Sequence, residues 1–215
     1  MAYPSDPYQK LQYHMDNTHN TYKLGYETIL PHLDNPPLDD LDNFLGYCRA
    51  WATSIVEHHD SEEEVLFPFL NQKLDFSTEI TQHVVVADGL EAIIKYIDES
   101  RSEPSKFEGS TLKELMQKLH DPLWEHLDQE VADLSPTALR VFTPEELAQA
   151  AKNLMVYIRA HSDAFITLPF MRSHTPAELK EVWPPFPWFM KRIIVPYVLA
   201  WKYSGYWKYA PFPIS

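Results

Sequence analysis

The sequence predicts an all-α fold, an up-down four-helix bundle with additional helices at its C-terminal end. Apolar residues recur every three or four positions over four long stretches, as they do on the buried face of an amphipathic helix. Only five glycines occur, and none stands in an Asn-Gly or Asp-Gly turn between alternating strands. Four long helices joined by short links pack as a bundle in which neighbours run in opposite directions.

The length and composition of the chain favour one sizeable core. A chain of 215 residues that is 45% hydrophobic can bury such a core. We expect residues 1–135 to form the bundle. Residues 136–215 are expected to form a helical, aromatic-rich extension that packs on it.

The helices of the bundle are bounded by prolines and polar loops. They are expected at roughly residues 8–33, 39–73, 77–100 and 111–134. Asn35-Pro36-Pro37 ends the first helix, because the residue before a proline disfavours helical geometry. Pro122 falls inside the fourth helix and predicts either a kink or a new first turn there.

The extension begins with a clear helix start. Thr143-Pro144-Glu145-Glu146 is a capping box with proline at the first helical position, and it predicts a fifth helix to about Leu168. Thr175-Pro176-Ala177-Glu178 repeats the pattern and predicts a short helix. An aromatic and basic segment follows over residues 189–208. We expect this segment to cover the bundle; a wall for an aromatic or lipid-like substrate and a contact with a membrane surface are the alternatives.

Charge and cysteine content restrict the partners and the compartment. A net charge of −13 is typical of a soluble protein and argues against nucleic-acid or anionic-membrane partners. No run of eighteen apolar residues occurs, so no membrane insertion is expected. The first residues lack the basic start and apolar core of a signal peptide. With Cys48 as the single cysteine, a reducing, cytoplasmic location is expected.

A run of histidine and glutamate, residues 58–64, carries the main chemical signal. His58 and Glu62 are four residues apart, so they share one face of a helix. The rest of that face is apolar: Phe44, Cys48, Trp51, Ile55, Val65 and Phe69. A carboxylate buried there would cost several kcal/mol unless a metal or a counter-charge met it. The pattern therefore predicts a metal site inside the bundle.

The other expected helices supply partners for this pair. Each of the four carries a histidine on its apolar face: His19, His58, His83 and His126. Glu130 follows the last of them by one turn, as Glu62 follows His58. Facing helices bring such residues together in di-metal carboxylate bundles. Imidazole and carboxylate ligands together suit iron, manganese or zinc.

Four segments within residues 8–135 resemble the hemerythrin family, in its wider cation-binding form with a His-His-x-x-Glu-Glu motif. They are Thr18-His19-Asn20, His58-His59-Asp60-Ser61-Glu62-Glu63 before Leu66-Phe67-Pro68, Gln82-His83, and His126-Leu127-Asp128-Gln129-Glu130. The C-terminal extension is similar to those of fungal members. The resemblance implies two iron ions in a non-haem di-iron centre that binds dioxygen, with Glu62 and Glu130 as bridges. The ligands that it implies are His19, His58, Glu62, His83, His126 and Glu130.

One position departs from the oxygen-carrying hemerythrins that the chain resembles. Those proteins have a second histidine one turn after the one on the third helix, where this chain has Ala87. Alanine cannot bind a metal, so another group must replace that ligand or the ligand is lost. His59 is the nearest candidate; the alternative is a solvated or structural role for it. The departure favours a site that reacts with oxygen over one that carries it.

Three classes of function are compatible with this pattern. The first is binding of iron and dioxygen, as in carriers and sensors. The second is a di-iron oxygenase or oxidase acting on a small aromatic, secondary-metabolite-like substrate, with His161 or Tyr22 as a proton source. The third is an interaction module whose metal is structural.

The remaining polar residues around the motif are given lesser roles. Glu63 and Glu64 are expected to face outward or to hold a ligand in place. Surface or loop positions are expected for His14, His32, His120 and His174.

Overall fold

The computed structural model describes residues 3–215 and contains seven α-helices, with no strand in that range. The predicted all-α fold is confirmed. The helices are α1 (Pro7–Ile29), α2 (Leu41–Ser61), α3 (Phe67–Leu70), α4 (Ser77–Ser102), α5 (Gly109–Asp133), α6 (Pro144–His161) and α7 (Ala164–Ser173). Two π-helices, η3 (Glu62–Leu66) and η6 (Met190–Leu199), complete the elements that matter for function.

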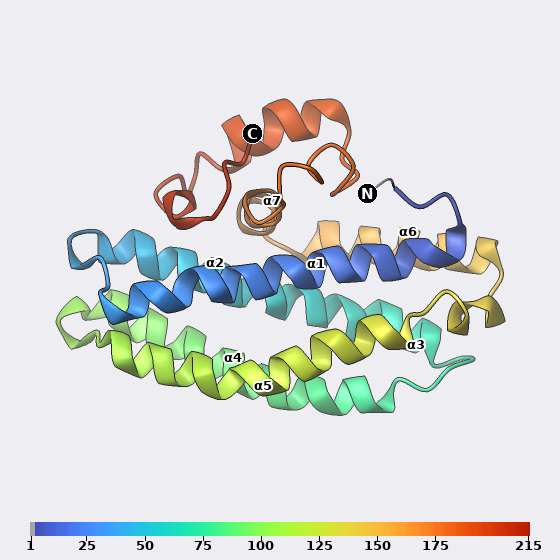
Figure 1. Ribbon diagram of the computed structural model, residues 1–215, viewed down its shortest axis with the longest axis horizontal. Helices are drawn as coiled ribbons and strands as arrows, with labels where there is room; N and C mark the ends of the chain where they lie inside the picture. Colours follow the sequence, from blue (N-terminus) through green and yellow to red (C-terminus); the bar gives the residue numbers. More distant parts are fainter. Residues whose placement is uncertain (1–2) are drawn as a thin grey trace.

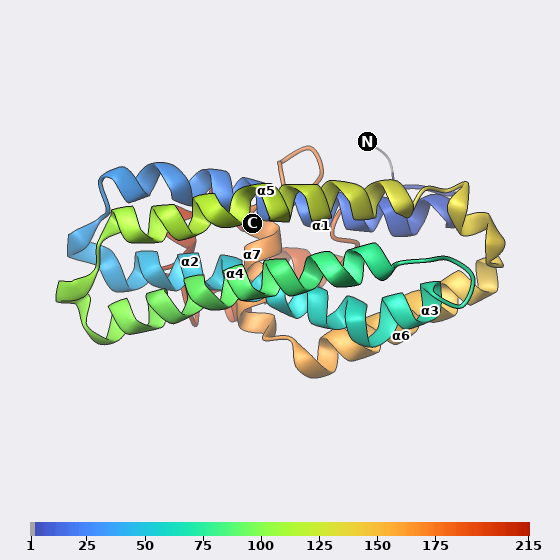
Figure 2. The same cartoon turned by 90° about the horizontal axis from the view of Figure 1, so that it is seen from below.

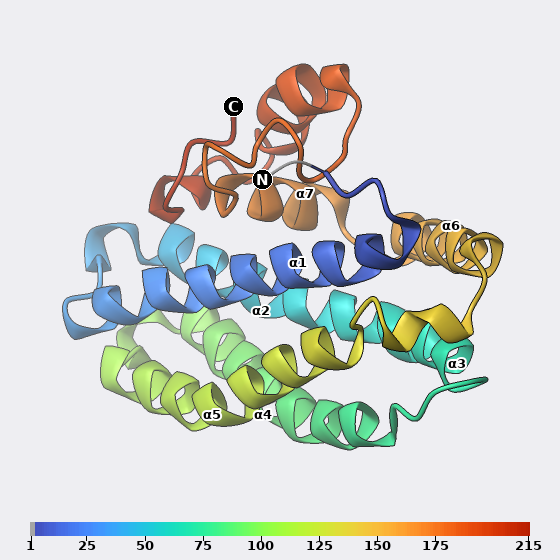
Figure 3. The same cartoon turned by 45° about the vertical axis from the view of Figure 1, so that its right-hand side comes forward.

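Four long helices form the bundle. Helices α1, α2, α4 and α5 lie side by side along the long axis of the molecule, and successive helices run in opposite directions (Figures 1 and 2). The segment from α6 to the C-terminus lies outside this bundle, with α7 crossing over it (Figure 3). None of the helices in the described range is long and apolar enough to cross a membrane.

The buried faces of α1 and α5 follow the predicted period. Asp6 caps α1 by accepting a hydrogen bond from the backbone N–H of Tyr8, and Pro7 occupies the first helical position. The expected face of α1 is buried from Met15 to Ile29, and that of α5 from Leu112 to Glu130. Helix α5 is continuous through Pro122, so no new helix begins there.

Helix α2 departs from the single long helix that was predicted. It ends at Ser61, and a π-turn over Glu62–Leu66 leads into α3. A π-turn adds a residue to the helical turn, so it shifts which residues face inward after it. Leu66, Phe67 and Leu70 are buried, whereas Val65 and Phe69 are half-buried. The prediction of Val65 and Phe69 as core residues was wrong for this reason.

In α4 the sequence places Ile80, Ala87, Leu90, Ile94 and Ile97 in phase with His83, and this predicted buried face was also partly wrong. Ala87 and Ile80 are exposed, and the buried residues that follow His83 are Val86, Leu90, Ile93 and Ile97. Both series have helical spacing. Three consecutive valines at 84–86 follow His83, so hydrophobicity could not show which neighbouring position faces inward.

The extension is more broken than predicted. The capping box at Thr143 is present, with reciprocal hydrogen bonds between Thr143 and Glu146. The fifth helix, however, ends at His161, and Asp163 caps a separate helix, α7. Residues 176–183 form turns in place of the short helix that was expected.

The extension completes the core of the bundle. Phe170, Tyr206 and Trp207 belong to the same hydrophobic cluster as Trp51. His174, expected at the surface, is buried because α7 folds over α2: Tyr47 donates its hydroxyl proton to His174 Nε2 at 2.7 Å. Burial lowers the pKa of His174 to about 3. The extension therefore stabilises the helix that carries the histidine and glutamate run.

Gly46→Ala is expected to destabilise the protein by about 1–3 kcal/mol through this contact. A Cβ at Gly46 would stand 2.2 Å from two ring atoms of Tyr206, which must then move out of the core. Chemical denaturation measures the loss. In a Tyr206→Ala background the same substitution should stabilise α2 slightly, because alanine is the better helix former. An equal loss in both backgrounds would show that Tyr206 does not pack on Gly46.

Candidate metal centre

Two groups of buried and half-buried side chains converge between the bundle helices. The first group is His59, Glu62, His83 and His126; the second is His19, His58, Glu62 and Glu130. Within each group, one potential ligand atom from every residue lies within 4.8 Å of all the others. The structure thus brings together all six predicted ligands and adds His59, and Glu62 belongs to both groups.

Each element of the bundle contributes to this centre. Helix α1 supplies His19, and α4 supplies His83. Helix α2 supplies His58 and His59, which are consecutive and point in different directions. The π-turn that begins at Glu62 places the Glu62 carboxylate in a ligand group with each of them. His126 and Glu130 stand one turn apart on α5.

The nitrogen atoms of facing histidines lie close to one another. The Nε2 atoms of His83 and His126 are 3.1 Å apart, and so are those of His19 and His58. Glu62 reaches both pairs, with one oxygen 3.0 Å from His58 Nε2 and the other 3.7 Å from His83 Nε2. An oxygen of Glu130 lies 3.3 Å from His19 Nε2 and 3.9 Å from His126 Nε2.

Hydrogen bonds on the outer side of three rings select the metal-binding tautomer. His19 Nδ1 donates to the carbonyl oxygen of Leu127 at 2.9 Å, and His83 Nδ1 donates to Glu63 at 2.9 Å. His126 Nδ1 points its proton at the side-chain oxygen of Gln82 at 3.4 Å. A neutral imidazole carries one proton, so Nε2 of each ring presents a lone pair inward. Lone pairs 3.1 Å apart repel unless a cation lies among them.

The buried oxygens of the two glutamates lead to the same conclusion. Among the described residues, neither oxygen of Glu62 or of Glu130 accepts a hydrogen bond, and His59 Nε2 has no partner. Burial, and then the nearby Glu130, raise the pKa of Glu62 well above its usual range. Burial, and then the neighbouring His83, lower the pKa of His126 to about 2. Neutral imidazoles and two carboxylates form a donor set that fits iron, manganese or zinc.

A comparison with known families decides the identity of this bundle. The hemerythrin HHE cation binding domain matches residues 11–138. The chain belongs to this family. The match confirms the predicted resemblance, and metal-ion binding is the property that the family name itself states.

A curated relative extends the similarity of this hemerythrin domain into the C-terminal part. It is "Dimeric xanthone biosynthesis cluster protein R11" of Cryptosporiopsis sp. (strain 8999), 28% identical over 184 residues. The matched part is 80% of this chain and 66% of the relative, so the chain spans just under two thirds of the relative's length. No solved structure matches the chain.

The centre of the hemerythrin domain is most open at His58. The His58 side chain is 14% exposed, whereas the other ligands are almost completely buried. Tyr22 lines this side, with its ring centroid 5.4 Å from that of His58 and its hydroxyl donating to the Ser54 carbonyl oxygen at 3.0 Å. Burial and the Glu62 carboxylate raise the pKa of Tyr22 well above its usual value, so its hydroxyl keeps its proton.

Other histidines near the motif lie outside the two groups. The helical pattern leaves His161 either as a packed histidine or as the proton source named above, but it is exposed and stacks on Tyr157. His120 pairs with Asp121 and stacks on Trp124 at the surface, as predicted. Glu63 is exposed and holds the His83 ring, as expected of a residue that supports a ligand.

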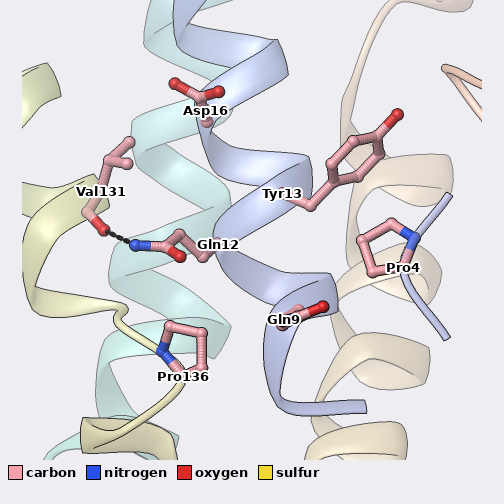
Figure 4. Close-up of a pocket in the computed structure, with 7 residues that line it drawn as sticks. All are labelled: Pro4, Gln9, Gln12, Tyr13, Asp16, Val131 and Pro136. Atoms are coloured by element: carbon pink, nitrogen blue, oxygen red, sulfur yellow. Dashed lines mark hydrogen bonds between the residues drawn. The ribbon is translucent and has the colours of Figure 1, made fainter. Parts of the chain in front are cut away.

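Neither of two surface pockets reaches the metal centre. The larger, of about 380 Å³, lies between the start of α1 and the end of α5, where Gln12 donates to the carbonyl oxygen of Val131 at 2.8 Å (Figure 4). The smaller, of about 250 Å³, lies in the extension. No predicted ligand lines either pocket, so neither is the expected substrate cavity beside the metals.

Proposed function

We propose that this hemerythrin domain binds two iron ions and dioxygen. The observation that carries the proposal is the sharing of Glu62, whose two oxygens face different histidine groups. Three histidines would hold one ion and two histidines the other, with Glu62 between the ions and Glu130 close to both sides. Ferrous ions bound there would supply the electrons for binding dioxygen.

The protein residues around the centre have defined tasks. The hydrogen bonds from the Nδ1 atoms fix the orientation of the histidine rings, which raises their affinity for metal. The apolar residues of the bundle exclude water and strengthen electrostatic interactions inside. The ring of Tyr22, whose hydroxyl keeps its proton, stands beside His58 on the side most open to solvent.

A second candidate function is oxidation of a small aromatic substrate by the same centre. The relative's printed name places it in a xanthone biosynthesis cluster, and xanthones are aromatic. No pocket that we describe joins the centre, so such a substrate would require a side chain or the extension to move. A structural metal in an interaction module is the third candidate.

Anaerobic reconstitution with ferrous iron, followed by admission of oxygen, separates these functions. We expect two iron ions per chain and an absorbance band that appears only with oxygen. A band that disappears when oxygen is removed supports binding. A transient band whose decay quickens with a hydroxyxanthone as probe supports oxidation. Full folding on zinc, with no oxygen-dependent band on iron, would refute both and favour a structural metal.

A further inference from the structure

An exposed apolar surface covers the π-helix η6 and the residues directly before and after it. We call it the η6 face and define it as Trp188, Phe189, Ile193, Tyr197, Val198 and Trp201. Trp201, Tyr197 and Trp188 are the most accessible, at 77%, 72% and 66%. An aromatic surface of this kind on a soluble protein marks an interaction site.

The helix geometry gathers these residues on one side. In a π-helix the hydrogen bonds span five residues, so side chains four and five positions apart share a face. Trp188, Ile193 and Tyr197 follow this spacing. Val195, Leu199 and Ala200 are buried on the opposite side, where η6 packs on α7. The η6 face therefore belongs to a docked helix, and η6 itself lies at the outer edge of the molecule, away from α4 and α5 (Figures 1 and 3).

The segment that carries the η6 face is basic. Residues 182–215 contain four cations and no acidic residue, although the whole chain carries −13. Arg192 and Lys202 are exposed among the aromatic residues, and the Lys202 ammonium lies 4.8 Å from the ring centroid of Tyr203. The net charge that argued against an anionic membrane is thus carried by other parts of the chain.

A basic pocket adjoins η6 and adds to this charge. Arg172, Lys180 and Arg192 line the pocket of about 250 Å³ together with one acid, Glu181, which pairs with Arg192. Arg172 and Lys180 are buried, and no carboxylate of the described residues lies within 4.0 Å of either cationic group. Both donate to backbone carbonyl oxygens, Arg172 to Lys180 and Lys180 to Pro213, and the pocket keeps an excess of positive charge beside η6.

We propose that the η6 face docks on the surface of an anionic lipid bilayer. Tryptophan and tyrosine prefer the boundary between water and hydrocarbon, and helices of aromatic and basic residues bind there without crossing the membrane. The basic residues would face the phosphates of the lipid headgroups. A second copy of the chain fits less well, because each face carries more cations than acids and two such faces would repel each other.

Sedimentation with lipid vesicles tests this docking. The protein is expected to sediment with vesicles that contain phosphatidylserine and much less with pure phosphatidylcholine, and its tryptophan emission should shift to shorter wavelength. Trp188→Ala combined with Trp201→Ala should weaken the binding by at least about tenfold, since burial of two indole rings exceeds the ~1.4 kcal/mol that tenfold represents.

Two further variants make the test specific. Val84→Ser with Val85→Ser removes exposed apolar residues from α4 and should leave vesicle binding unchanged. Lys202→Glu should weaken binding to phosphatidylserine vesicles and leave iron content unchanged. Failure to sediment with either kind of vesicle would overturn the proposal. So would equal losses in the tryptophan and valine variants, or self-association through the tryptophans without vesicle binding.

Discussion

Glu62→Ala is expected to abolish the loading of both metal ions, because Glu62 alone belongs to both groups of ligands. Its oxygens lie near His58 on one side and near His83 on the other. In the proposed two-iron centre, loss of the carboxylate would remove one ligand from each ion and the negative charge between two cations. Metal analysis after anaerobic reconstitution measures the stoichiometry, which should fall from two ions per chain to less than one.

The neighbouring glutamate provides the matched control. Glu63 is exposed and accepts a hydrogen bond from His83 Nδ1, so Glu63→Ala removes a support for the ring and no ligand. Loss of such a hydrogen bond to a ligand lowers the metal affinity about ten- to hundredfold. The stoichiometry at saturating iron should therefore stay at two. If the two variants lost metal to the same extent, the inward orientation of Glu62 would be wrong.

Loss of metal must also be separated from loss of folding. In the metal-free protein the Glu62 carboxyl group is buried without a hydrogen-bond partner, which opposes folding. Glu62→Gln keeps the volume and removes the charge, so the metal-free variant should be at least as stable as the wild type. Chemical denaturation in the presence of a chelator measures this. A less stable variant would mean that Glu62 has a structural partner in the metal-free state.

The sequence predicts the ligands from helices α1 and α5 more securely than those around the π-turn. On α1 and α5 the core residues recur every three or four positions, and His19, His126 and Glu130 fall on the same buried face. The three valines after His83 allow two faces for α4. Hydrophobic periodicity assumes a constant number of residues per turn, so it could not reveal the wider turn at Glu62.

His59 shows the consequence of that wider turn. Periodicity alone selects His58 as the inward residue and leaves its neighbour open, since adjacent residues on a helix point in different directions. In the structure Glu62 stands between both histidines, and both lie in a ligand group with it. The paired histidines of the motif were the signal in the sequence that His59 could be a ligand. Its role became clear only from the position of α4 in the structure. The His59 ring stacks on the His83 ring with centroids 4.1 Å apart.

His59→Ala is expected to lower the metal content from two ions per chain to one. His59 is the third histidine of the first group, and its buried Nε2 has no other partner among the described residues. Without it, that ion keeps His83, His126 and a shared carboxylate, whereas the second group is unchanged. Metal analysis and circular dichroism together would show the loss of one ion from a folded protein.

The substitution Ala87→His tests whether His59 replaces the histidine that this chain lacks on its third bundle helix. Ala87 is exposed and Val86 faces the core, so a histidine at 87 should point to solvent. It should leave the metal content of the wild type unchanged and should not restore the second ion to His59→Ala. If it did restore that ion, position 87 of α4 would face the centre. A single substitution would then give this chain the ligand pattern of the oxygen carriers. If it does not, α2 supplies both histidines, and the first metal group depends on the π-turn that places Glu62 between them.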